Sequence, residues 1–455
     1  MRTVESAPLS ASRLLAYAAP TVALQAMLVP LYNFLPPVYY APEIGLGAAL
    51  VGLLFALGRV WEAITDPLIG AWSDRTRSRI GRRRVWMLAG APVALGATYF
   101  LLNPPQGVAW PYLLLWLMVF YLGWSMVYIP HQTWGTELAG DYHERTRIAG
   151  YRETGAFVGY LCATIVPLVY WSALRGVSYP SFAQIVQAVG AFFVVALPLA
   201  ILWCFRAVPD ADRHADEATP SWTEMLAILG RNRPFLRLIG AYIVDRLALG
   251  TYFAVLPPLI AQAYGIGKDL LWVALANTVA AVVFAPLWVP LARRLGKHRA
   301  YCLANGLTAL AYLSFFFLPA GQLWPVMLGN MVLAAGNGGT MILPAAMAAD
   351  AADNDELSSG FKQPGGHMAF LAFVFKAGMG LGVFVGLGFI QLYGYHDLAQ
   401  VLTGSAMQGV RLGASILPAA LLLIPILLMW RYPIDNQRHE QIQRELRRRQ
   451  LAKLT

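Results

Sequence analysis

Residues 61–84 read WEAITDPLIGAWSDRTRSRIGRRR and join an apolar segment to a basic one. Two carboxylates, Glu62 and Asp66, interrupt the apolar segment, and six arginines follow in the eleven residues from Asp74 to Arg84. About 20 mostly apolar residues suffice to span a membrane, and arginine gathers in the cytoplasmic loops between such spans. The stretch therefore predicts a membrane-spanning helix that carries buried acids and ends in a basic cytoplasmic loop.

The rest of the chain has the composition of a polytopic membrane protein. Of its 455 residues, 58% are hydrophobic and only 13% are charged, whereas a soluble domain has about 25% charged residues. Apolar segments of spanning length recur twelve times and leave little sequence for a soluble domain. The predicted spans are residues 14–40, 47–73, 85–103, 109–138, 149–172, 182–206, 235–263, 269–293, 299–319, 323–349, 366–393 and 407–431.

The basic residues alternate between connections. They lie after the even-numbered spans, and the opposite connections contain only Arg175 and Lys268. This asymmetry predicts that both termini are cytoplasmic, and it accounts for the net charge of +10 without a nucleic-acid partner. The apolar runs hold the chain's three cysteines without a metal-binding spacing, so we expect packing residues and no cofactor or structural metal.

The chain divides into two halves of six spans. The longest polar cytoplasmic break, residues 207–234, separates an N-terminal bundle (1–206) from a C-terminal bundle (235–431), and a basic tail follows (432–455). Similar turns, SDRTRSRIGRRR and ARRLGKHRA, follow the second and eighth spans, which is the offset expected of a duplicated bundle. We predict an all-α major facilitator fold with its substrate near the midplane between the halves, present as a monomer in lipid. The tail is expected to lie on the inner leaflet or to form a solvated helix.

The acids of the second span are the leading functional candidates, because ionisable residues in a bilayer are costly. Arg59, Glu62 and Asp66 are spaced i, i+3, i+7 and share one helical face with Thr65. Pro67 lacks an N–H and so frees a carbonyl in the preceding turn. Such a set of hard oxygens suits Na⁺ or a proton. The alternative is a buried network in which Arg59 neutralises one acid, which leaves the second acid unexplained.

Four stretches carry a family resemblance. GRVWEAITDPLIGAWSDRTRSRIGRRR (58–84) resembles the second helix and following loop of the glycoside–pentoside–hexuronide:cation symporters, the melibiose-permease-like branch of the major facilitator superfamily. YIPHQTWGTELAGDYHERTRIAGYR (128–152), DAADNDELSSG (350–360) and FVFKAGMGLG (373–382) resemble, in order, its fourth helix and loop, its acidic loop after helix ten and its eleventh helix. The resemblance implies a cation-coupled transporter of the bacterial inner membrane.

The resemblance also implies roles for residues. Glu62 and Asp66 would bind the coupling cation, with Thr65 and Ser125 as further oxygen ligands. Lys376 would approach these acids from the other half and take part in coupling. Apart from the resemblance, Arg59 is also expected to take part in coupling, because it shares the helical face of the two acids.

Two departures from the family concern the substrate. The family's sugar transporters carry an aspartate on helix one and another on helix four, where this chain has Thr21 and Tyr128. The helix-five arginine of the family corresponds either to Arg152 or to Glu153. The predicted substrate residues are Thr21, Asn33, Tyr128, His131, Gln132, Trp134, Arg152, Asp245 and Arg246.

Some of these residues carry structural expectations as well. We expect Pro130 to break the helix between Tyr128 and Trp134. The side chains of Asp245 and Arg246 diverge by about 100° and need not pair, so Arg246 either binds an acidic group of the substrate or pairs with another helix.

A set of charged residues is expected to gate the cytoplasmic side. Asp74 lies at a helix C-terminus, where a negative charge is unfavourable, and therefore needs cationic partners. Ion pairs that form and break would provide a bistable element. The predicted gate residues are Asp74, Arg75, Arg82, Arg83, Glu137, Asp141, Arg145, Asp350 and Asp353.

These patterns predict a secondary transporter and not an enzyme, since no catalytic constellation or phosphate-binding glycine loop occurs. The expected substrate is a sugar, glycoside or uronate-like solute, moved together with Na⁺ or H⁺. An acidic ligand is ranked just ahead of one with a large apolar part, and a lysolipid transporter is the alternative. A non-transporting sensor of the same fold remains a further alternative.

Overall fold

The computed structural model describes residues 9–33, 40, 46–105, 107–138, 142–177, 181–210, 230, 232–359, 364–396 and 401–452. Within these ranges the chain consists of helices and their connections, without a β-strand. Twelve helical segments of the described chain are long and apolar enough to cross a membrane. The predicted all-α polytopic fold is therefore confirmed. Most of the predicted linker, residues 211–229 and 231, lies outside the described residues.

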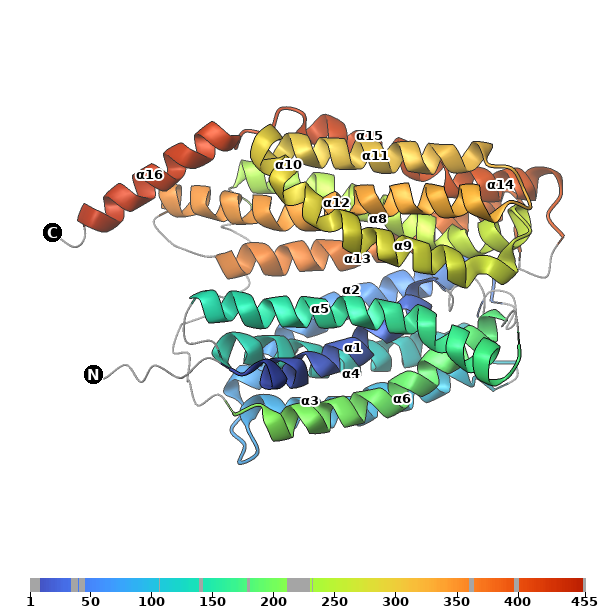
Figure 1. The fold of residues 1–455 in the computed structure, drawn as a ribbon, viewed down its shortest axis with the longest axis horizontal. Coiled ribbons are helices and arrows are strands. Elements are labelled where there is room, and N and C mark those ends of the chain that lie inside the picture. The colour runs from blue at the N-terminus through green and yellow to red at the C-terminus, as the bar shows by residue number, and fades with distance from the viewer. Residues whose placement is uncertain are drawn as a thin grey trace. The chain divides into compact units, whose positions relative to one another are not determined.

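The first compact unit, here called the N-terminal bundle, contains the described residues up to Asp210 and also His396. In this unit α1 packs against α5 and α6, while α4 packs against α2 and α3 (Figure 1). Its helices are α1 (Ala11–Asn33), α2 (Ala48–Arg75), α3 (Arg82–Leu102), α4 (Trp110–Leu138), α5 (Tyr142–Pro167) with a π-helical extension η2 (Leu168–Leu174), and α6 (Phe182–Ala207).

The second unit, here called the C-terminal bundle, contains the remaining helices. They are α8 (Arg233–Pro258) with η3 (Leu259–Ala263), η4 (Gly267–Asp269), α9 (Leu270–Phe284), η5 (Ala285–Leu287), α10 (Trp288–Leu295), α11 (Lys297–Phe317), α12 (Leu323–Ser359), α13 (Pro364–Leu392), α14 (Gly404–Ala414), α15 (Ile416–Met429) and α16 (Asn436–Ala452). Here α8 packs against α13 and α15, and α12 packs against α9 and α11.

The two units repeat one packing pattern. In each, the first span lies against the fifth and sixth, and the fourth span lies against the second and third. The weak sequence repeat therefore corresponds to a repeated arrangement of helices, as expected for a duplicated bundle.

Prolines act differently in different spans. The eighth span changes to a 3₁₀ turn at η5, which contains Pro286, before it continues as α10. Pro67 and Pro130, by contrast, lie inside continuous helices. The expectation that Pro130 breaks α4 is therefore wrong, because a helix among other helices can accommodate the loss of one backbone donor.

Helix α2 presents two different faces. Arg59, Glu62, Thr65 and Ser73 are buried inside the bundle. Large apolar side chains lie exposed along the opposite side and alternate with the buried positions at helical spacing. These exposed residues are Leu53, Leu57, Val60, Ile64 and Leu68. The acids therefore face protein, whereas the apolar stripe suits lipid.

The tail helix α16 packs on the C-terminal bundle. Ile442 and Leu446 are buried in a hydrophobic cluster with residues of α8, α11 and α12. Gln443 Nε2 donates a hydrogen bond to Asp353 Oδ2 at 2.6 Å. The interpretation of this segment as a plainly solvated helix is therefore wrong, because its few apolar residues gather on one side.

Candidate functional site

The two acids of α2 have different partners. Arg59 forms an ion pair with Glu62 one turn away, and both side chains are at most 2% exposed. Asp66 accepts a hydrogen bond of 2.5 Å from Ser125 Oγ on α4, and Ser125 is fully buried. The spacing of acids on α2 thus places one carboxylate beside a cation and the other beside a hydroxyl.

Helix α2 supplies two further oxygens to this cluster, a hydroxyl and a backbone carbonyl. The Thr65 hydroxyl is buried and donates to the backbone carbonyl of Glu62 at 3.1 Å. Carboxylate, hydroxyl and carbonyl oxygens are the ligands of hard cations. The cluster in the N-terminal bundle therefore contains the types of oxygen atom that a monovalent cation or a proton would bind, while the roles assigned to Glu62, Thr65, Asp66 and Ser125 remain predictions.

Several predicted substrate residues lie inside the packing of the N-terminal bundle. Thr21 is buried. His131 is also buried, its Nε2 lies 2.7 Å from the Tyr17 carbonyl, and the two rings stack with centroids 4.5 Å apart. Trp134 is fully buried, with the Arg84 guanidinium 5.1 Å from its ring. In this arrangement His131 and Trp134 contact neighbouring helices.

Arg152 and Tyr128 are better placed to meet a solute. Arg152 is 15% exposed and pairs with its neighbour Glu153 at 2.7 Å. It lies within electrostatic range of Tyr17 and Tyr128. Tyr128 is partly exposed and stacks on Trp124 with ring centroids 6.1 Å apart. The α5 arginine and the α4 tyrosine therefore belong to one neighbourhood.

For three further predicted residues the structure gives only their position and burial. Gln132 is partly buried on α4. Asn33 is the last residue of α1, and its side chain lies outside the described residues. Lys376 is partly buried on α13 of the C-terminal bundle, and its approach to the α2 acids stays a prediction.

Asp245 and Arg246 form a closed network in the C-terminal bundle. Arg246 Nη2 lies 2.9 Å from Asp245 Oδ1 and donates to Thr340 Oγ1 at 2.5 Å. Tyr301 donates to the other oxygen of Asp245 at 2.8 Å. Although neighbouring side chains leave a helix at different angles, the long arginine folds back onto its neighbour. The expectation that the two need not pair is therefore wrong, and the expected alternative, an ion pair of Arg246 with another helix, is not what is observed: its ion-pair partner is Asp245 on the same helix.

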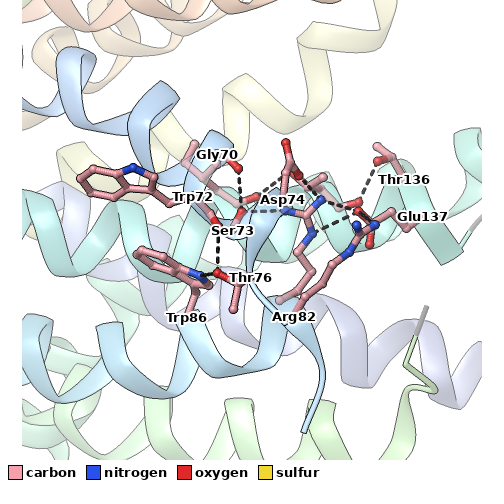
Figure 2. A network of polar contacts seen from close by, with 12 residues as sticks. Gly70, Trp72, Ser73, Asp74, Thr76, Arg82, Trp86, Thr136 and Glu137 are labelled. Carbon is pink, nitrogen blue, oxygen red and sulfur yellow. Dashed lines mark hydrogen bonds and ion pairs between the residues drawn. The ribbon is translucent and has the colours of Figure 1, made fainter. Parts of the chain in front are cut away.

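Charged residues join the ends of α2, α3 and α4 (Figure 2). Arg83 is 2% exposed and forms ion pairs with Asp74 and Glu137, and it also donates to Ser73 Oγ at 2.6 Å. Arg82 reaches the same Glu137 oxygen at 2.8 Å. Asp74 at the C-terminus of α2 therefore has the cationic partner that its position requires.

Two of the other predicted gate residues, Asp350 and Asp353, have partners within the C-terminal bundle. Asp350 pairs with Lys297 at 2.6 Å and with His439 at 3.3 Å, both within the C-terminal bundle. Asp353 accepts from Gln443, as described above. Neither Lys297 nor Gln443 was among the predicted partners. Arg75 is exposed and forms no ion pair with the part of the chain that the structure describes. Asp141 and the side chain of Arg145 lie outside the described residues.

Tyr121 is a site residue that the sequence did not reveal. Its ring lies beneath the Arg59 guanidinium, with Arg59 Cζ 4.9 Å from the ring centroid. A tyrosine in an apolar span is usually a packing residue. The one local signal is Gly58, which makes room for this ring, and that relation is visible only in three dimensions.

Comparisons with known proteins give a matching family model and several relatives. The family model described as MFS/sugar transport protein matches residues 16–436. A glucuronide carrier protein homolog of Escherichia coli is 26% identical, over 89% of this chain and 88% of that one. A putative sulfoquinovose importer of Salmonella typhimurium is 26% identical, over 90% and 87%. A sodium-dependent lysophosphatidylcholine symporter of Danio rerio is 23% identical, over 87% and 80%.

The fold also matches solved structures. A bacterial homolog of the human lysosomal transporter Spinster, in an inward-facing conformation, superposes with a TM-score of 0.66. The match covers 95% of this chain and 97% of that one at 13% sequence identity, and it therefore supports the fold alone.

Proposed function

Because this chain belongs to the family of MFS/sugar transport proteins, we propose that it carries an acidic sugar or glycoside across the membrane together with Na⁺ or H⁺. It is an integral membrane transporter and not an enzyme. The class of solute, its coupling to Na⁺ or H⁺ and the residues responsible for that coupling are proposed here.

The polar cluster of the N-terminal bundle is the observation that best supports coupling to a cation. Glu62 and Asp66 are one turn apart on α2, and the partner of each is a different kind of group, a guanidinium and a hydroxyl. A charge in the middle of an apolar span is costly, and a purely structural pair would need only one acid. The second acid is accounted for by reversible binding of a cation.

The charges of the predicted substrate residues favour an acidic solute. Thr21 and Tyr128 replace two carboxylates, so a negative solute meets less repulsion than it would beside two aspartates. Arg152 is partly exposed beside Tyr128, and an arginine can bind a carboxylate or sulfonate through two parallel hydrogen bonds. Arg246, the other candidate for this role, is fully buried and already bonded within its bundle. Two relatives are named for glucuronide and sulfoquinovose, which are both acidic sugars.

Transport by reconstituted vesicles tests the proposal. Purified protein would take up a labelled glucuronide or a neutral galactoside under an imposed Na⁺ or H⁺ gradient. We expect gradient-driven accumulation of the glucuronide, abolished in Glu62→Gln and in Asp66→Asn while solute exchange persists. Glu440→Gln on α16, at a side chain that is 65% exposed, serves as the matched control. Normal accumulation by either α2 variant would contradict the assignment.

A lysolipid is the second candidate substrate. The lysophosphatidylcholine symporter among the relatives and the loss of both sugar-anchoring acids favour it. The same vesicles distinguish the two candidates, because competition by lysophosphatidylcholine without competition by glucuronide would favour the lipid.

A further inference from the structure

Tyr121 is fixed beside the pair of charges on α2. Its side chain is 1% exposed, and the Arg59 guanidinium lies over its ring. The ring packs against Gly58, where an added Cβ would lie 2.8 Å from Tyr121 Cε2. A cation–π contact with a desolvated arginine is attractive. The ring therefore helps to keep the guanidinium at this position.

The hydroxyl of the same residue is not explained by this packing. Among the residues that the structure describes, Tyr121 Oη has no hydrogen-bond partner, although the side chain lies within electrostatic range of Glu62. A buried hydroxyl without a hydrogen-bond partner lowers the stability of the folded protein. Phenylalanine would give the same ring contact without this cost, so the hydroxyl is accounted for if it acquires a partner in another arrangement of the site.

Binding of a cation at Glu62 would create that arrangement. A second positive charge at this carboxylate repels the guanidinium. The carboxylate then loses the donor that Arg59 supplied, and Tyr121 on the neighbouring helix carries a neutral donor close by.

We propose that Tyr121 is a positioning residue of the cation site. Its ring holds Arg59, and its hydroxyl donates a hydrogen bond to Glu62 when the coupling cation displaces Arg59. The inference rests on the proposed role of Glu62 in coupling. It assigns to α4 a second contribution to the site, one turn before Ser125.

The substitution Tyr121→Phe tests the hydroxyl alone, because it keeps the ring. The thermal unfolding midpoint of the purified protein in lipid nanodiscs would be titrated with NaCl at fixed pH and ionic strength, and with pH in sodium-free buffer. The variant is then compared with the wild type for whichever ion, Na⁺ or H⁺, shifts the unfolding midpoint of the wild type. Because the proposed bond exists only with the cation bound, its loss weakens cation binding. We expect a half-saturating Na⁺ concentration about tenfold higher, or a midpoint pH about one unit lower.

Tyr312→Phe is the matched control. Tyr312 on α11 is fully buried, and its hydroxyl also has no partner in the described chain. This variant should leave the ion response unchanged. An unchanged ion response in Tyr121→Phe would overturn the inference while leaving the proposed function intact, provided that Glu62→Gln abolishes the response. A wild type without any Na⁺ or H⁺ response would instead overturn both.

Discussion

Replacing Arg246 alone is expected to destabilise the C-terminal bundle, because the substitution leaves the Asp245 carboxylate buried without its cation. Breaking one side of a buried ion pair costs about 3–5 kcal/mol. We therefore expect Arg246→Met to lower the thermal unfolding midpoint markedly and the double variant with Asp245→Asn to recover part of the loss. Arg444→Met, at a side chain that is 75% exposed, is the control. Wild-type stability combined with lost solute binding would instead restore Arg246 as a substrate residue.

For individual residues, the sequence predicted which charged side chains belong to the candidate site better than it predicted the partners of those side chains. Glu62 and Asp66 stand out because a carboxylate in an apolar span has no packing explanation. Their neighbours Arg59 and Ser125 were inferred from helical spacing and from the family resemblance. Tyr121 could not be inferred, since its position depends on how closely α4 approaches α2 at a glycine.

Among the elements, the contact between α8 and α13 depends on glycine. A Cβ on Gly382 would lie 2.8 Å from Gly250 Cα, which is a backbone atom of the facing helix. Gly382→Ala should therefore push the helices apart and lower the unfolding free energy by about 1–3 kcal/mol. Gly388 lies on the same helix with nothing within 4 Å of its Cβ position. Gly388→Ala should be neutral or slightly stabilising, and equal losses from both substitutions in thermal unfolding would argue against helix contact as the cause.

The spans themselves were predictable from length and hydropathy, whereas their irregularities were not. Pro130 was expected to end a helix and does not, while the turn at Pro286 was not expected. Whether a proline interrupts a span depends on neighbouring helices and side chains that accept the freed backbone groups. Similarly, the docking of α16 depends on Ile442 and Leu446, two apolar residues too few to signal burial in a highly charged segment.

For the whole molecule, the arginine distribution predicts the orientation in the membrane. Ser78 and Asn103 are both exposed at opposite ends of α3. In a background without the native cysteines, Asn103→Cys should react with an impermeant maleimide added to intact cells, whereas Ser78→Cys should react only after the membrane is opened. Both termini are then cytoplasmic. If only Ser78→Cys reacted in intact cells, the orientation would be the opposite of the predicted one.

The repeated packing also constrains how the protein is made. Helix α1 packs against α5 and α6, and α6 ends only at Ala207. Domains generally fold as units during synthesis, N-terminal domain first, so the nascent chain inserts α1 long before its partners exist. Thr21 and Gln25, buried in the finished bundle, must pass this interval beside lipid or the insertion machinery. Polar side chains that face lipid are costly, so retention of α1 by the insertion machinery until α5 and α6 emerge would protect the growing chain.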